Sequence, residues 1–105
     1  MKEISPSELK KMIDEQHDFE LIDVREEYER EIASIGGRLI PLASIMDQAG
    51  DIPKNKPVVI FCRSGKRSAV AIMELEARHG FSNLLNLRGG ILAYSDEVDP
   101  SVPKY

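Results

Sequence analysis

The segment of the chain with the clearest chemical potential runs from Cys62 to Ser68 and has the sequence CRSGKRS. It contains the only cysteine of the protein, followed closely by three cations, Arg63, Lys66 and Arg67. The thiolate is the nucleophilic form of cysteine, and nearby positive charges favour it by lowering the pKa of the thiol. The segment therefore predicts a reactive sulfur.

The position of this segment in the chain supports the same interpretation. Residues 58–61 (VVIF) are the most β-prone stretch and predict a buried central strand, and residues 67–79 predict a helix. Ligands of α/β sheets bind beyond the carboxyl ends of strands, and a loop that closes onto a helix start directs backbone N–H groups toward an anion. Gly65 allows the tight curl. We expect these N–H groups and the Ser68 hydroxyl to surround an ionised, reachable sulfur.

The segment also has two simpler interpretations. A lone cysteine is often a small buried hydrophobe, and three cations often mark a solvated helix start. However, cations at the beginning of a helix oppose its dipole, a cost that a bound anion removes. A Cys–His pair has no support, because His17 and His79 both lie far from Cys62 in sequence. With a single cysteine we expect no internal disulfide, no metal site and no cofactor.

Composition limits the remaining classes of protein. The chain has 105 residues, the size of one domain, with 42% apolar and 30% charged residues. No apolar run approaches the roughly 20 residues that cross a bilayer, and the first residues lack the apolar stretch of a secretory signal. We therefore expect a cytoplasmic protein without a membrane partner. A net charge of −4 argues against nucleic acid as the main partner.

Strands and helices alternate along most of the chain. Beyond the elements around Cys62, the patterns predict helices over residues 5–16, 42–49 and 91–95, a helix-compatible segment over 25–32, and strands over 19–24, 39–40 and 83–87. This order predicts a single α/β domain over residues 1–105. Its mostly parallel sheet has about five strands with helices on both faces. The core should span residues 3–98, and an extended tail should cover 96–105.

Four segments together resemble one known family. CRSGKRS after VVIF resembles the active-site loop of rhodanese-homology sulfurtransferases. The segments LIDVRE, IGGRLIPL and NLRGGILAY, which begin at Leu21, Ile35 and Asn86, are similar to further signatures of that domain and occur in the same order. The similarity covers nearly the whole chain. It is greatest to rhodanese domains associated with adenylyltransferases that activate small ubiquitin-like sulfur carriers.

The resemblance implies a rhodanese-like fold and a role for individual residues. Cys62 would carry a sulfane sulfur as a persulfide, taken from thiosulfate, another persulfide or mercaptopyruvate. The residues implied to bind donor or acceptor are Arg63, Ser64, Gly65, Lys66, Arg67 and Ser68, with Asp23 and Arg25 as support, more simply interpreted as an ion pair at a strand end. The implied acceptor is cyanide, a thiol such as glutathione, or a sulfur-carrier protein. We expect a monomer or weak dimer.

The sequence also departs from the family, and two alternatives stay open. Ser34, Gly36, Arg30 and Tyr94 stand where many members have histidine, proline, an aromatic residue and tryptophan, which bears on the rim of the site and on acceptor preference. Related domains with a C-x5-R loop act on phosphate or arsenate, whereas the loop here has the shorter C-x4-R spacing. Non-catalytic binding modules of the family commonly lack the cysteine or the loop charges, which this chain retains.

Overall fold

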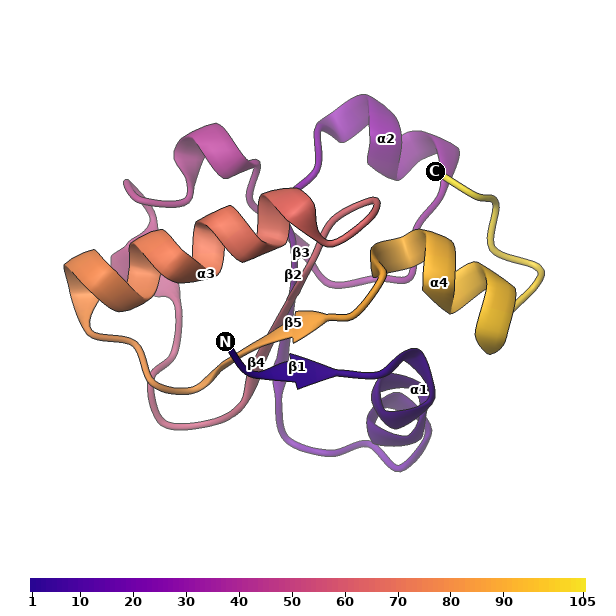
Figure 1. The fold of residues 1–105 in the computed structure, drawn as a ribbon, viewed down its shortest axis with the longest axis horizontal. Helices are drawn as coiled ribbons and strands as arrows, with labels where there is room; N and C mark the ends of the chain where they lie inside the picture. Colours follow the sequence, from indigo (N-terminus) through magenta and orange to yellow (C-terminus); the bar gives the residue numbers. More distant parts are fainter.

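The computed structural model describes residues 1–105 and contains one five-stranded sheet. The strands are β1 (Glu3–Ile4), β2 (Glu20–Asp23), β3 (Arg38–Leu39), β4 (Val58–Phe61) and β5 (Leu84–Leu87). They pair in the order β1-β5-β4-β2-β3, and every pair is parallel. The helices are α1 (Pro6–Asp14), α2 (Glu27–Ile32), α3 (Lys66–His79) and α4 (Gly90–Glu97), as Figure 1 shows.

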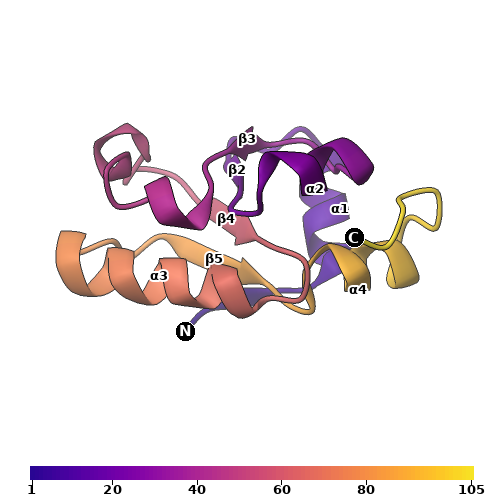
Figure 2. The same ribbon diagram turned by 90° about the horizontal axis from the view of Figure 1, so that it is seen from above.

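Successive side chains of β4 point to opposite faces of the sheet, and each face has its own part of the hydrophobic core. Val58 and Ile60 pack in one cluster, which includes Ile72 of α3, whereas Val59 and Phe61 pack in a second cluster with Leu9 of α1 and with α4. In both views α3 lies apart from α1 and α4 (Figures 1 and 2). All four β4 residues are buried, as expected of a central parallel strand covered on both faces. The predicted fold class is confirmed.

One predicted helix differs from the structure, and one predicted helix cap is confirmed. The helix predicted over 42–49 is wrong: the chain forms two short 3-10 turns, Leu42–Ser44 and Ala49–Asp51, joined by further turns. The segment lies between Pro41 and Gly50, and in this turn conformation its apolar residues Ile45 and Ala49 are buried in the core. The capping box predicted for α1 is present, with Glu8 N–H donating to Ser5 Oγ at 3.1 Å.

The two ends of the chain also differ from expectation. Strand β1 is absent from the prediction because two residues are too few to show an alternation, yet both pair with β5. The tail is not extended throughout residues 96–105, because α4 continues to Glu97 and a turn follows, closed by Val102 N–H donating to Asp99 O. Val102 is buried in the second cluster, which holds this turn against the domain. None of the helices has both the length and the apolarity that a bilayer span requires.

Candidate active site

Cys62 directly follows β4, and its sulfur lies inside the curl of the next loop. The Gly65 N–H donates to the Cys62 Sγ at 3.1 Å and the Ser68 N–H donates to it at 3.4 Å. Gly65 adopts φ 104°, a conformation that glycine reaches without strain, and it immediately precedes α3. Cys62 is only 1% exposed, because its side chain also packs in the cluster under α3. The N–H groups therefore face the sulfur, but the sulfur is less accessible than expected.

The N-terminal turn of α4 explains why the loop turns its N–H groups inward. Ile91 N–H donates to the Cys62 carbonyl at 3.0 Å, and Leu92 N–H donates to the Arg63 carbonyl at 3.2 Å. Both carbonyls thus point away from the sulfur. Gly90 permits this contact, since a Cβ at that position would lie 2.3 Å from the Arg63 oxygen. Gly90, the second glycine after β5, is therefore required by backbone contact with the loop that follows Cys62.

A buried amide side chain supports the loop from β5. Asn86 is 5% exposed, its Nδ2 donates to the Gly65 carbonyl at 3.2 Å, and its Oδ1 accepts from the Ser68 hydroxyl at 2.6 Å. The Ser68 Oγ also lies 3.4 Å from the Cys62 Sγ. Sequence reasoning assigned this hydroxyl to the sulfur and did not include Asn86 in the site. The only available signal was the position of Asn86 at the start of NLRGGILAY.

The surroundings of Cys62 lower the pKa of its thiol. Burial is the largest single influence and raises the pKa, but hydrogen bonds from the N–H groups of Ser68, Gly65 and Ser64 lower it, and on balance the pKa falls. Hydrogen bonds to a charged group stabilise that form over its neutral form. The loop therefore favours the thiolate even though the side chain is buried.

Arg67 is held by an acidic partner on a different helix. Its Nη1 and Nη2 donate to the two carboxylate oxygens of Glu29 at 2.6 and 2.8 Å. The hydrogen bonds with Arg67 are the main cause of the lowered pKa of Glu29, and the same bonds raise the pKa of Arg67. Sequence reasoning missed Glu29, because α2 is dense in charge and resembles a solvated helix. Of the three loop cations, Arg67 is the one neutralised within the protein.

The other two cations of the loop remain available. Arg63 and Lys66 are exposed, and neither forms an ion pair. The Arg63 guanidinium lies over the Tyr105 ring at 5.1 Å from its centroid, and the Tyr105 ring meets that of Tyr28 edge to face at 6.3 Å. The C-terminus accordingly lies beside α2 in Figure 1. Positive charge at the loop surface thus comes from Arg63 and Lys66.

Asp23 and Arg25 form a fully buried ion pair where β2 ends. The Arg25 Nη2 and Nε donate to the carboxylate of Asp23 at 2.8 and 2.9 Å. Arg25 also donates to the carbonyl of Ala33 at 2.7 Å, and its guanidinium lies 5.5 Å from the Phe61 ring centroid. Every polar bond of this guanidinium is made within the protein. The pair therefore connects β2 to the end of α2, which is the simpler of the two roles considered from the sequence.

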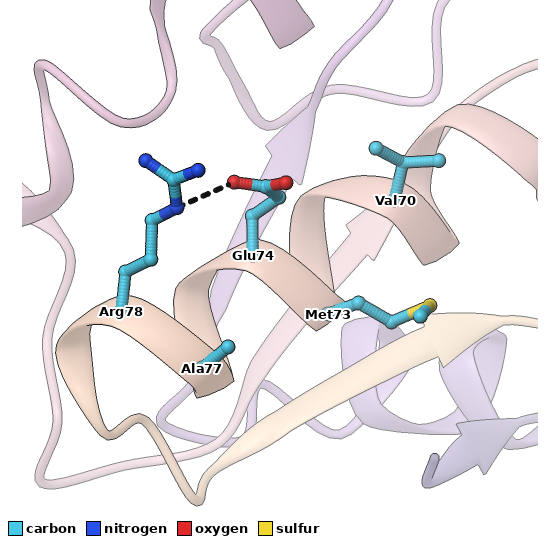
Figure 3. Close-up of a pocket in the computed structure, with 5 residues that line it drawn as sticks. All are labelled: Val70, Met73, Glu74, Ala77 and Arg78. Atoms are coloured by element: carbon cyan, nitrogen blue, oxygen red, sulfur yellow. Dashed lines mark ion pairs between the residues drawn. The ribbon is translucent and has the colours of Figure 1, made fainter.

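The surface hollows lie away from the loop. One of about 380 Å³ follows α3 and is lined by Val70, Met73, Glu74, Ala77 and Arg78; in Figure 3 the side chains of Glu74 and Arg78 project from one side of the helix as an ion pair. Another of about 570 Å³ includes Arg30 and Ser34, two of the positions that depart from the family. No group of three or more histidine, cysteine, aspartate or glutamate side chains is placed to hold a metal ion.

Comparison with known proteins decides the family. The family described as Rhodanese-like domain matches residues 5–97. The chain belongs to the rhodanese-like family. The match confirms the resemblance drawn from the four sequence segments and extends over nearly the whole fold, including the loop around Cys62.

Rhodanese-like relatives occur in several protein contexts. The chain is 35% identical over 97% of its length to the probable adenylyltransferase/sulfurtransferase MoeZ of Mycobacterium tuberculosis, covering 26% of that protein. It is 37% identical over 90% of its length to the tRNA uridine(34) hydroxylase of Bdellovibrio bacteriovorus, covering 28% of it. The chain thus spans about a quarter of the length of these curated relatives. Among solved structures, a rhodanese-like domain protein of Staphylococcus aureus has a TM-score of 0.82 and 31% identity, with 100% and 99% of the two chains covered.

Proposed function

We propose that this rhodanese-like domain is a cytoplasmic sulfurtransferase that carries a sulfane sulfur on Cys62 as a persulfide. The observation that carries the proposal is the arrangement of the Gly65 and Ser68 N–H groups around the Cys62 sulfur, at 3.1 and 3.4 Å. Such donors hold an anionic sulfur, and the lowered pKa of Cys62 supplies the nucleophilic form of the thiol. The similarity to a sulfurtransferase such as MoeZ supports sulfur transfer in general.

The first half-reaction loads the enzyme. With thiosulfate as donor, the Cys62 thiolate attacks the outer sulfur; a new S–S bond forms, the S–S bond of thiosulfate breaks, and sulfite leaves with the electron pair. One negative charge stays on the outer sulfur of the persulfide, so charge balances. Arg63 and Lys66, the unpaired cations, attract the dianionic donor. The loop N–H groups stabilise the charge on the sulfur.

The second half-reaction unloads the enzyme to an external nucleophile. A thiolate or cyanide attacks the outer sulfur, and the Cys62 thiolate leaves. The chain has no second cysteine, so it does not release the sulfur by forming an internal disulfide. Donor and acceptor therefore react in turn with Cys62, and initial rates should give parallel double-reciprocal lines. A sulfur-carrier protein is a further acceptor of the same chemistry, in keeping with the similarity to adenylyltransferase/sulfurtransferases.

Mass measurement of the intact protein after exposure to thiosulfate tests the proposal. We expect the addition of one sulfur atom to the wild-type chain, its removal by cyanide, and no addition to Cys62→Ser. Because Cys62 is buried, the loading rate also measures how readily the loop opens to the donor. A chain that binds thiosulfate without taking up sulfur would be a binding module. A chain that takes up no sulfur but releases phosphate from an aryl phosphate would be a phosphatase.

A further inference from the structure

Asn86 is a buried polar residue that the proposed reaction leaves without a role. It lies in β5, paired with Ile60 of β4 on one side and Glu3 of β1 on the other. Its side chain leaves the sheet to contact the loop at both Gly65 and Ser68. Gly65 and Ser68 are also the two residues whose N–H groups donate to the Cys62 sulfur, so the Asn86 amide affects how the loop binds the sulfur.

The neighbours of the Asn86 amide fix its orientation. The Nδ2 lies 3.2 Å from the Gly65 carbonyl oxygen and 3.8 Å from the Met1 sulfur, and both of these atoms only accept hydrogen bonds. The nitrogen must therefore face them, which places Oδ1 toward Ser68. An amide oxygen only accepts, so in the bond of 2.6 Å the Ser68 hydroxyl is the donor.

A hydroxyl has one hydrogen, and here that hydrogen is already engaged. The Ser68 Oγ consequently presents lone pairs toward the Cys62 Sγ, 3.4 Å away. A protonated thiol can donate to those lone pairs. A thiolate gains the hydroxyl as a donor only when the bond to Asn86 breaks, and the buried Oδ1 then loses its partner. Asn86 and the Cys62 thiolate thus compete for one hydrogen.

We propose that Asn86 is a positioning residue that directs the Ser68 hydroxyl away from the Cys62 sulfur and thereby disfavours the empty thiolate. The consequence for catalysis rests on the proposed function. In a persulfide the negative charge lies on the outer sulfur, and the inner sulfur is uncharged and requires no third donor. The bond between Ser68 and Asn86 then persists without competition. The arrangement therefore favours the loaded form of Cys62 over the empty thiolate.

A double-mutant cycle on Asn86 and Ser68 tests the competition directly. The pH dependence of Cys62 alkylation by iodoacetamide gives the apparent pKa of the thiol in the wild type, Asn86→Leu, Ser68→Ala and the double variant. Asn86→Leu should lower the pKa by about one unit, because the freed hydroxyl donates to the thiolate. In the Ser68→Ala background the same change should produce no shift. Equal shifts in both backgrounds, or no shift in either, would overturn the proposal.

Ser68→Ala alone is a second test that does not depend on the folding of Asn86→Leu. Since the hydroxyl hydrogen belongs to Asn86, its removal should move the pKa of Cys62 by less than about half a unit. A rise of about one unit or more would show that the hydroxyl donates to the sulfur, contrary to the proposal. The charged groups near this end of the sheet are the same in all four proteins: Arg63 and Lys66 in the loop and first turn of α3, Arg67 with Glu29, and Asp23 with Arg25.

The catalytic consequence has a separate readout. At a fixed ratio of thiosulfate to sulfite, Asn86→Leu should carry the persulfide on a smaller fraction of molecules than the wild type, measured by intact mass. An equal or larger fraction would contradict the claim that Asn86 favours the loaded form. If the wild type takes up no sulfur, the proposed function fails, while the alkylation cycle still decides whether Asn86 directs the hydroxyl.

Discussion

Arg67 and Glu29 face each other with both guanidinium Nη atoms bound to both carboxylate oxygens, at 2.6 and 2.8 Å. The Glu29 side chain is 4% exposed and that of Arg67 is 34% exposed. This pair joins the first turn of α3, which begins directly after the Cys62 loop, to α2. The position of α3 relative to the sulfur therefore depends on a charge pair that acid can remove.

Glu29→Gln should lower the free energy of unfolding by about 1–2 kcal/mol at neutral pH, a modest value because Arg67 is partly solvated. The pKa of Glu29 is lowered by folding, so its contribution exists above the unfolded-state pKa and is lost as pH falls through the folded value. Urea unfolding should show a constant loss above about pH 5 that shrinks below about pH 4.

Glu74→Gln is the matched control for this change, because its pair with Arg78 lies exposed on the surface of α3. It should alter the free energy of unfolding by less than about 0.5 kcal/mol. Equal losses from the two substitutions would mean that burial of Glu29 adds nothing to the pair.

The lowered pKa of Cys62 should appear both in reactivity and in stability. Alkylation of the folded wild type should reach half its maximum at a lower pH than alkylation of the urea-unfolded chain. A thiol whose pKa falls on folding stabilises the native state above its unfolded pKa, and this contribution is lost as pH falls through the folded value. The stability of the wild type relative to Cys62→Ser should therefore rise as pH increases toward about 9. A pH-independent difference would contradict the lowered pKa.

Gly90→Ala and Gly80→Ala separate backbone strain from contact with the loop. Both glycines have nearly the same φ, 65° and 67°, but a Cβ at Gly90 lies 2.3 Å from the Arg63 carbonyl oxygen, whereas a Cβ at Gly80 meets nothing within 4 Å. Gly80→Ala should cost about 1 kcal/mol of stability from strain alone. Gly90→Ala should cost at least about 2 kcal/mol more and slow Cys62 alkylation. Similar costs for the two variants would show that the loop accommodates the methyl group.

Lys66→Ala should weaken donor binding without changing the fold. Lys66 is exposed at the start of α3 and has no ionic partner, so its charge is available to an anion. The KM for thiosulfate should rise about three- to tenfold at low ionic strength, and the effect should diminish as salt screens the charge. Lys11→Ala removes the same charge from α1 and should leave KM unchanged. An unchanged KM for Lys66→Ala would remove this residue from the site.

Local patterns predicted the elements that carry their own signals. The strand VVIF, the capping box at Ser5 and the glycine at the end of α3 are each read from neighbouring residues, and each is present in the structure. The α/β class follows from their order. The eight-residue pattern at 42–49 predicts a helix, and this prediction is wrong. The same apolar spacing also allows a series of turns to bury these residues against the core.

The partners of the active loop were beyond such reasoning because they come from distant segments. Glu29 reaches Arg67 across 38 positions of sequence, and Asn86 reaches Ser68 across 18. No local pattern identifies one charge of α2 as buried, or one amide of a strand as facing a loop. The burial of Cys62 under α3 has the same origin, since it depends on how the helix packs over the sheet.

Because α4 N–H groups bind the carbonyls of Cys62 and Arg63, the segment CRSGKRS alone does not determine which backbone groups face the sulfur. Grafted onto the strand–helix junction of an unrelated sheet, the same seven residues would lack the Gly89–Gly90 corner that draws those oxygens outward. The peptide planes would then be free to rotate and bring carbonyl dipoles, instead of N–H groups, toward the sulfur. The arrangement of N–H groups around the Cys62 sulfur thus depends on two segments together, the β4–α3 loop and the β5–α4 turn, and transplanting it requires both.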